Sequence, residues 1–161
     1  MIFKTSLDKT AITITVIITV LFAFIIATQY LIATPGNAAT SLCVTIILLV
    51  LYCLSFAFHP TAYKVTQDVL IICRPIWNVE IKRTDIQSIA LVNKKDLSGA
   101  IRTFGVGGVF GYYGCFANYT LGSMTWYATR KDNAVLITTI KNKKIVVTPN
   151  EPSAFIAALN T

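Results

Sequence analysis

The side chains that could do chemistry are few in this sequence, and they are not grouped. His59 is the single histidine, and seven acidic residues are spread along 161 positions. Nucleophilic, acid–base and metal-assisted catalysis each need several such groups held close together. The cysteines lack the C-x-x-C spacing of zinc and redox sites; they are Cys43, Cys53, Cys73 and Cys115. We therefore expect no catalytic residue, no metal and no cofactor, and we predict that the protein is not an enzyme.

A glycine-rich segment, Arg102 to Gly122, has the composition of a ligand-binding loop. It holds six of the eight glycines. A phosphate-binding P-loop would end in Gly-Lys-Ser or Gly-Lys-Thr, which this segment lacks. A dinucleotide-binding loop would need glycine where Phe110 stands, three residues after Gly107. Nucleotide binding is therefore not expected.

Two interpretations of this segment remain open. Glycines inside strands mark bulges, corners or close approaches of backbone, which a small and strongly curved β domain requires. Alternatively, the segment forms a hairpin that faces the membrane or a partner. No charged residue lies from Phe104 to Met124, and aromatic residues alternate with the glycines. For this second interpretation the candidate surface residues are Phe110, Tyr112 and Tyr113.

Basic residues outnumber acidic residues in the second part of the chain. Residues 61–161 contain 12 Lys plus Arg and 6 Asp plus Glu. The dense basic clusters are Lys94-Lys95 and a turn with Lys141, Lys143 and Lys144. Such a turn is either simply solvated or attracted to anionic lipid headgroups, at about 1 kcal/mol per cation near the surface. Aromatic and basic residues are not interleaved as in nucleic-acid-binding grooves, so a nucleic acid is not expected. No small-molecule substrate is evident either, because no catalytic group of residues is assembled.

Two apolar runs near the N-terminus predict a membrane-spanning hairpin. No Lys, Arg, Asp or Glu lies between positions 10 and 60. The runs cover residues 11–33 and 41–58, and a helix of about 20 residues crosses the hydrocarbon core of a bilayer. A signal peptide would account only for the first run, and its apolar part would be about 7–15 residues long. We therefore divide the chain into a transmembrane hairpin, residues 1–60, and a second domain, residues 61–161.

The positions of the cations predict the orientation of this hairpin. The loop between the two runs is uncharged, and its Pro35 and Gly36 suit a tight turn. Lys4 and Lys9 flank the first run, and Lys64 follows the second. Because cytoplasmic flanks of membrane helices carry an excess of Lys and Arg, we expect both termini in the cytoplasm. The expected location is the cell (inner) membrane, with two passes.

After residue 60 the apolar pattern changes to the alternation that is typical of β-strands. Residues 63–66 and 69–73 predict one hairpin, residues 77–82 a further strand, and residues 134–140 and 144–148 a second hairpin. A C-terminal helix follows, with an apolar face that could close one end of the domain. This face carries Phe155, Ile156 and Leu159.

Four parts of this second domain form a recognisable pattern: residues 63–72, the strand that starts at residues 85–89, residues 102–114, and Pro149 and Phe155 before and within the last helix. In these parts the chain resembles the bacterial PH-like (pleckstrin-homology-like) domain family. This similarity covers roughly residues 60 to 160, and members of the family commonly carry two membrane helices before the domain. The resemblance implies an α+β membrane protein: a transmembrane hairpin followed by an antiparallel β-barrel or sandwich of about seven strands, capped by a C-terminal helix. It brings no catalytic residue.

These observations favour a membrane-anchored, non-catalytic binding or regulatory module. Its partner would be another protein, a second copy of this chain or the membrane surface. The alternatives are a subunit of an oligomeric small transporter or channel, and an accessory subunit of a membrane enzyme. The two runs lack the ionisable residues that mark transport pathways, which favours plain anchors.

Overall fold

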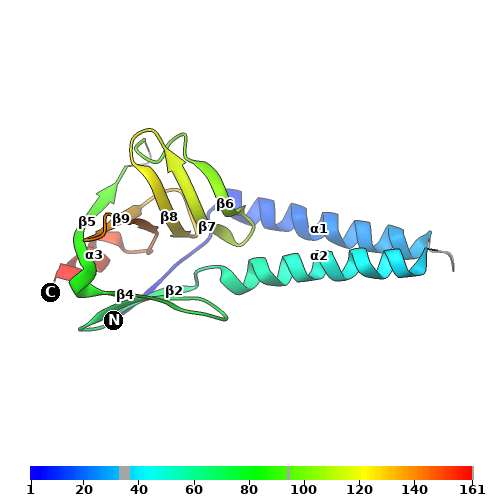
Figure 1. Ribbon diagram of the computed structural model, residues 1–161, viewed down its shortest axis with the longest axis horizontal. Helices are drawn as coiled ribbons and strands as arrows, with labels where there is room; N and C mark the ends of the chain where they lie inside the picture. The colour runs from blue at the N-terminus through cyan, green and yellow to red at the C-terminus, as the bar shows by residue number, and fades with distance from the viewer. Residues whose placement is uncertain (33–36, 94, 161) are drawn as a thin grey trace.

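Two long helices extend side by side from one end of a β domain (Figure 1). The computed structural model describes residues 1–32, 37–93 and 95–160. Helix α1 covers Lys9–Leu31 and helix α2 covers Ala38–Phe58. Both are long and apolar enough to cross a membrane, and only 6% and 11% of their most apolar windows are buried, unlike the core helices of soluble proteins. The turn predicted at Pro35 and Gly36 lies outside the described residues.

Local hydrogen bonds satisfy polar groups along both helices and at the start of α1. The side chain of Asp8 caps α1 by accepting a hydrogen bond from the backbone N–H of Ala11 at 2.6 Å. Along both helices, hydroxyl groups donate to the carbonyl four residues earlier, as Thr15 does to Ala11 at 2.7 Å and Ser55 does to Leu51 at 2.9 Å. These hydroxyl groups thus have partners within their own helix, as an apolar surrounding requires.

The β domain contains ten strands in two sheets within the described residues. The first sheet has the order β1-β2-β3-β4, with β1 (Ile2–Lys4), β2 (Ala62–Val65), β3 (Val69–Cys73) and β4 (Val79–Lys82). The second has the order β5-β9-β10-β8-β7-β6, with β5 (Ile86–Val92), β6 (Ile101–Gly108), β7 (Gly111–Asn118), β8 (Gly122–Ala128), β9 (Ala134–Thr139) and β10 (Lys144–Val147). A 3-10 helix (Arg83–Asp85) precedes β5, and α3 (Pro152–Asn160) follows the last strand. The α+β class predicted from sequence is confirmed, with ten strands where about seven were expected.

The chain enters the first sheet before it enters the first helix. Strand β1 pairs antiparallel with β2, so that Phe3 lies opposite Tyr63. The amino group of Met1 donates to the carbonyl of Val65 at 2.7 Å. The segments before α1 and after α2 therefore lie at the same end of the helix pair (Figure 1).

The strand pairings of the second sheet fix which of its ends faces the helices. The turn between β6 and β7 is the end closest to α1, because a side chain at Gly108 would meet Ile14. From this turn β7 runs away and β8 returns antiparallel. Strand β10 lies parallel to β8, the one parallel pair among the described strands, and so it starts at the far end of the sheet. The turn before β10 is consequently remote from the helices.

Helix α3 packs on the core as its apolar face predicts. Phe155 is fully buried, and its ring meets Phe3 edge-on at 5.3 Å between centroids. Leu159 is buried and Ile156 is partly buried against the same cluster. This core lies between the first sheet, α3 and strands β9 and β10, whereas a second core, with Trp126 and Phe116, lies on the side of β7 and β8.

Candidate binding site

The tip of the β6–β7 hairpin packs against the bases of both helices. The backbone N–H of Phe110 donates to the hydroxyl of Thr15 in α1 at 2.9 Å. The Phe110 ring lies 5.2, 5.4 and 5.7 Å from the rings of Tyr52, Phe56 and His59, respectively. Thr15 is six residues into α1, or about 9 Å along the helix axis. The tip of the hairpin therefore lies beside the apolar part of α1, beyond its first turn, and beside the last turns of α2.

Two tyrosines next to the tip complete this junction. The hydroxyl of Tyr113 donates to the carbonyl of Ser55 in α2. The hydroxyl of Tyr112 donates to the carboxylate of Asp8, the cap of α1, at 3.2 Å. Burial, together with the Asp8 carboxylate, raises the pKa of Tyr112 to about 12. Tyr112 therefore keeps its proton, and its bond to Asp8, to a higher pH than an exposed tyrosine would.

The structure brings three of the six predicted surface residues together and separates the other three. Phe110, Tyr112 and Tyr113 meet at the junction with the helices, where both tyrosines are buried. The basic turn with Lys141, Lys143 and Lys144 lies at the opposite end of the sheet.

The basic turn is at least five strand residues from the hairpin tip, or about 16 Å. Lys144 also uses its ammonium group to donate to the carbonyl of Leu121 at 2.6 Å, whereas Lys141 and Lys143 are exposed. Lys94, from the other basic cluster, lies outside the described residues. The two groups of predicted surface residues thus do not form one surface.

A second contact with the helices was not anticipated from sequence. The β3–β4 loop contains Arg74, Ile76 and Trp77, which we call the membrane-side rim. Strand β4 begins at Val79, so Trp77 lies in this loop and not in the predicted strand; its side chain is 66% exposed. The Trp77 ring lies 6.2 Å from that of Phe58 at the end of α2, and the Arg74 guanidinium lies 5.4 Å from the Phe58 ring centroid. Strands β2 and β3 separate this loop from α2 in the sequence, so no local pattern marked the contact.

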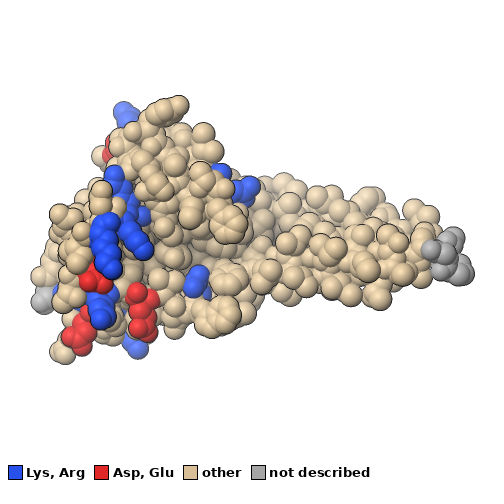
Figure 2. All heavy atoms as spheres, in the orientation of Figure 1, with Lys and Arg blue, Asp and Glu red and all other residues tan. Residues whose placement is uncertain are grey.

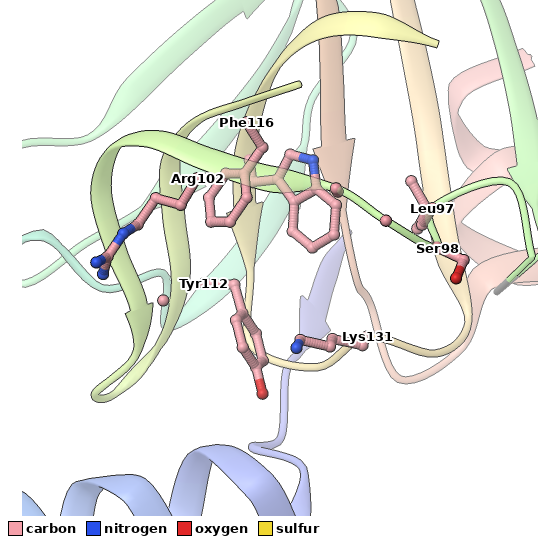
Figure 3. A pocket seen from close by; sticks show the side chains of 10 residues that line it. Leu97, Ser98, Arg102, Tyr112, Phe116 and Lys131 are labelled. Carbon is pink, nitrogen blue, oxygen red and sulfur yellow. The ribbon is translucent and has the colours of Figure 1, made fainter. Parts of the chain in front are cut away.

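A pocket of about 470 Å³ opens beside the hairpin, between β6, β7 and β8 and the loop before β6 (Figure 3). We call it the Trp126 pocket, and its principal lining residues are Leu97, Arg102, Tyr112, Phe116, Trp126 and Lys131. Two of these residues, Arg102 and Lys131, are cationic, and three, Tyr112, Phe116 and Trp126, are aromatic. No acidic side chain is among the described residues that line it.

Together these features define a class of protein: a two-sheet β domain, closed by one helix and docked on two apolar helices. The model of the bacterial PH domain family matches residues 61–161, and the chain therefore belongs to that family. No curated protein and no solved structure matches the chain. The PH-like domain indicates a non-catalytic binding module, in keeping with the function expected from the sequence.

Proposed function

We propose that this protein is a membrane-anchored, non-catalytic binding module whose PH-like domain recognises the surface of the membrane that holds its two helices. The observation that carries this proposal is the membrane-side rim. It places an exposed tryptophan and an arginine at the end of α2, where an embedded helix would leave the hydrocarbon core.

The chemistry of the rim fits the boundary between lipid and water. Tryptophan concentrates at this boundary because its ring is apolar and its N–H is polar. Ile76 is also exposed, and the Arg74 guanidinium can bind a lipid phosphate through charge-assisted hydrogen bonds. A cation near an anionic membrane contributes about 1 kcal/mol. Because the helices already anchor the chain, this energy would set the orientation and lipid preference of the domain.

The orientation of the helices follows the distribution of charge. In the visible face of Figure 2, Lys, Arg, Asp and Glu lie on the domain, and the helices carry none along most of their length. We infer that the domain and both termini are cytoplasmic, on the inner side of the cell membrane, because cytoplasmic flanks carry the excess of cations.

Quenching of Trp77 by brominated lipids tests this function directly. The full chain is used, because residues 61–161 alone would lack β1 and the Asp8 contact. In a Trp126→Phe background, Trp77 is the single tryptophan. It is measured in nanodiscs that contain equal amounts of an anionic and a zwitterionic phospholipid, with one or the other brominated near the headgroup.

We expect brominated anionic lipid to quench Trp77 more strongly than brominated zwitterionic lipid does. Arg74→Gln should remove this preference and leave contact with both lipids, whereas Lys143→Gln on the remote turn should change neither. Absence of quenching by either lipid would refute contact with the membrane surface. Equal quenching by both lipids in the full chain that retains Arg74 would refute recognition of anionic lipid.

Self-association is a second candidate function, because β6 ends the second sheet and has no neighbour on its outer side among the described strands. Its exposed residues include Ile101 and Phe104, the latter 78% exposed. A free strand edge of this kind can pair with the same edge of a second chain. Single-molecule photobleaching in nanodiscs should then report dimers that Phe104→Lys dissociates. Monomers in the unsubstituted protein would exclude this function.

A further inference from the structure

The Trp126 pocket has a cationic end beside α1. Lys131 places its ammonium group 4.8 Å from the ring centroid of Tyr112. Arg102 extends along β6 toward Gly107, where an added Cβ would lie 3.5 Å from the Arg102 side chain. Since Gly107 and Tyr112 are opposite each other in the β6–β7 pair, the two cations flank Tyr112, Arg102 from β6 and Lys131 from the loop after β8. Figure 3 shows Arg102 and Lys131 on opposite sides of the Tyr112 ring.

The positive charge of this end exceeds the negative charge beside it. Arg102 and Lys131 form no ion pair among the described residues. The Asp8 carboxylate accepts hydrogen bonds from Tyr112 and from the backbone N–H groups of Ala11 and Lys131, so its single negative charge offsets only part of the charge of the two cations. Two cations beside aromatic rings, in a partly enclosed site, are a receptor for an anion.

The remainder of the pocket is aromatic and apolar. The rings of Phe116 and Trp126 stack at 4.6 Å between centroids and 24° between planes, with Leu97 buried beside them. Trp126 is 2% exposed, and its Nε1–H is a buried donor without a hydrogen-bond partner among the described residues. A buried donor that lacks a partner destabilises the fold.

We propose that the Trp126 pocket binds an anionic amphiphile. Its phosphate or carboxylate group is held by Arg102 and Lys131, and its apolar part lies on the Phe116–Trp126 stack. The volume of about 470 Å³ is within the range of small-molecule sites. This inference goes beyond recognition of the membrane surface, because no residue of the membrane-side rim lines the pocket.

The indole N–H resonance of Trp126 reports occupancy of the pocket. The full chain, labelled with ¹⁵N-tryptophan in zwitterionic nanodiscs, is titrated separately with dodecyl phosphate, dodecanol and inorganic phosphate. Dodecyl phosphate carries both the anionic group and the alkyl group, dodecanol carries the alkyl group without the anion, and inorganic phosphate is the anion alone. Trp77, on the membrane-side rim, reports separately on amphiphile that enters the surface of the bilayer.

We expect dodecyl phosphate to shift the Trp126 resonance saturably, at concentrations at least tenfold lower than those needed for either other probe. Arg102→Gln combined with Lys131→Gln should weaken this binding at least tenfold, and Lys141→Gln combined with Lys143→Gln should leave it unchanged. A silent Trp126, an equal response to dodecanol, or an equal response to inorganic phosphate would overturn the proposal.

A second variant keeps the test decisive if the double substitution disturbs folding. Gly107 has no left-handed backbone conformation, so Gly107→Val fills the pocket beside Arg102 without backbone strain. It should abolish the Trp126 shift while the Trp77 resonance and the melting temperature stay unchanged; retained binding would contradict the assignment. The nanodiscs themselves contain no anionic lipid, so a silent Trp126 would refute binding in the pocket and would leave recognition of the membrane surface standing. Likewise, absence of Trp77 quenching by brominated lipids would refute surface recognition and would leave binding in the pocket standing.

Discussion

The carboxylate of Asp8 accepts a hydrogen bond from the hydroxyl of Tyr112, with distances of 3.2 and 3.3 Å to its two oxygens. The same carboxylate caps α1 through Ala11 and receives the backbone N–H of Lys131 at 3.2 Å. One acidic residue thus joins the first apolar helix to β7 and to the loop after β8. The attachment of the domain to its helices is therefore polar at Asp8 and aromatic at Phe110.

Asp8→Ala should loosen this attachment. The substitution removes a helix cap, at a cost of about 0.5–2 kcal/mol, and leaves the hydroxyl of buried Tyr112 without its acceptor, at about 1–3 kcal/mol. We expect a clearly lower melting temperature of the full chain in nanodiscs, followed by near-ultraviolet circular dichroism. Asp132→Ala is the matched control, because the Asp132 side chain is 60% exposed and its ion pair with Arg130 is long, at 3.9 Å. Equal melting of both variants would contradict a joining role for Asp8.

Two adjacent glycines should differ sharply in their tolerance of alanine. Gly108 has φ +128°, and an added Cβ would lie 2.6 Å from Cδ1 of Ile14 in α1. Gly107→Ala adds only an ordinary contact at 3.5 Å. We expect Gly108→Ala to destabilise the docked hairpin by about 1–3 kcal/mol, and Gly107→Ala to have a small effect, both measured by thermal unfolding. If Gly108→Ala were neutral, the close packing of the hairpin on α1 would be refuted.

Stability should fall at alkaline pH because of Tyr63. Burial raises the pKa of Tyr63 to about 12, whereas an unfolded tyrosine titrates near about 10. Between these values the unfolded chain loses a proton that the folded chain retains, so the free energy of unfolding decreases by about 1.4 kcal/mol per pH unit. Below about pH 10 Tyr63 is protonated in both states, and its stabilising contribution to the free energy of unfolding is fully present.

The test is denaturant unfolding of the full chain between pH 9 and pH 12, for the unsubstituted protein and for Tyr63→Phe. In Tyr63→Phe the free energy of unfolding should fall less steeply with pH, by the equivalent of about one proton. The variant should also be less stable at neutral pH, since the Tyr63 hydroxyl donates to the carbonyl of Tyr127 at 2.5 Å and accepts from the N–H of Thr148 at 3.0 Å. Identical slopes would contradict the assigned pKa.

The elements with strong local patterns could be predicted from the sequence. The β2–β3 and β9–β10 hairpins and α3 lie where alternation and helical spacing placed them. Strand β1 could not be predicted, because a strand of only three residues carries no local signal. Its partner β2 follows only after both apolar helices. Such pairing depends on the tertiary fold and not on propensity.

The candidate site was predictable in composition but not in geometry. Phe110, Tyr112 and Tyr113 are aromatic residues in an uncharged segment, and sequence alone could not decide between core and surface. The structure places the tyrosines against Asp8 and Ser55, contacts that span 104 and 58 residues. The glycines of the same segment allow close approach of backbone, as Gly105 and Gly114 do where they face each other across β6 and β7.

Exchange of the Phe110 amide hydrogen is the most direct test of the central claim, that the PH-like domain is docked on the two apolar helices, as the proposed function requires. The amide donates to the hydroxyl of Thr15, so NMR-detected exchange of the full chain in nanodiscs should be slow. Thr15→Val, which keeps the shape and removes the acceptor, should accelerate it markedly. Exchange at the unprotected rate in the unsubstituted protein would contradict docking of the hairpin.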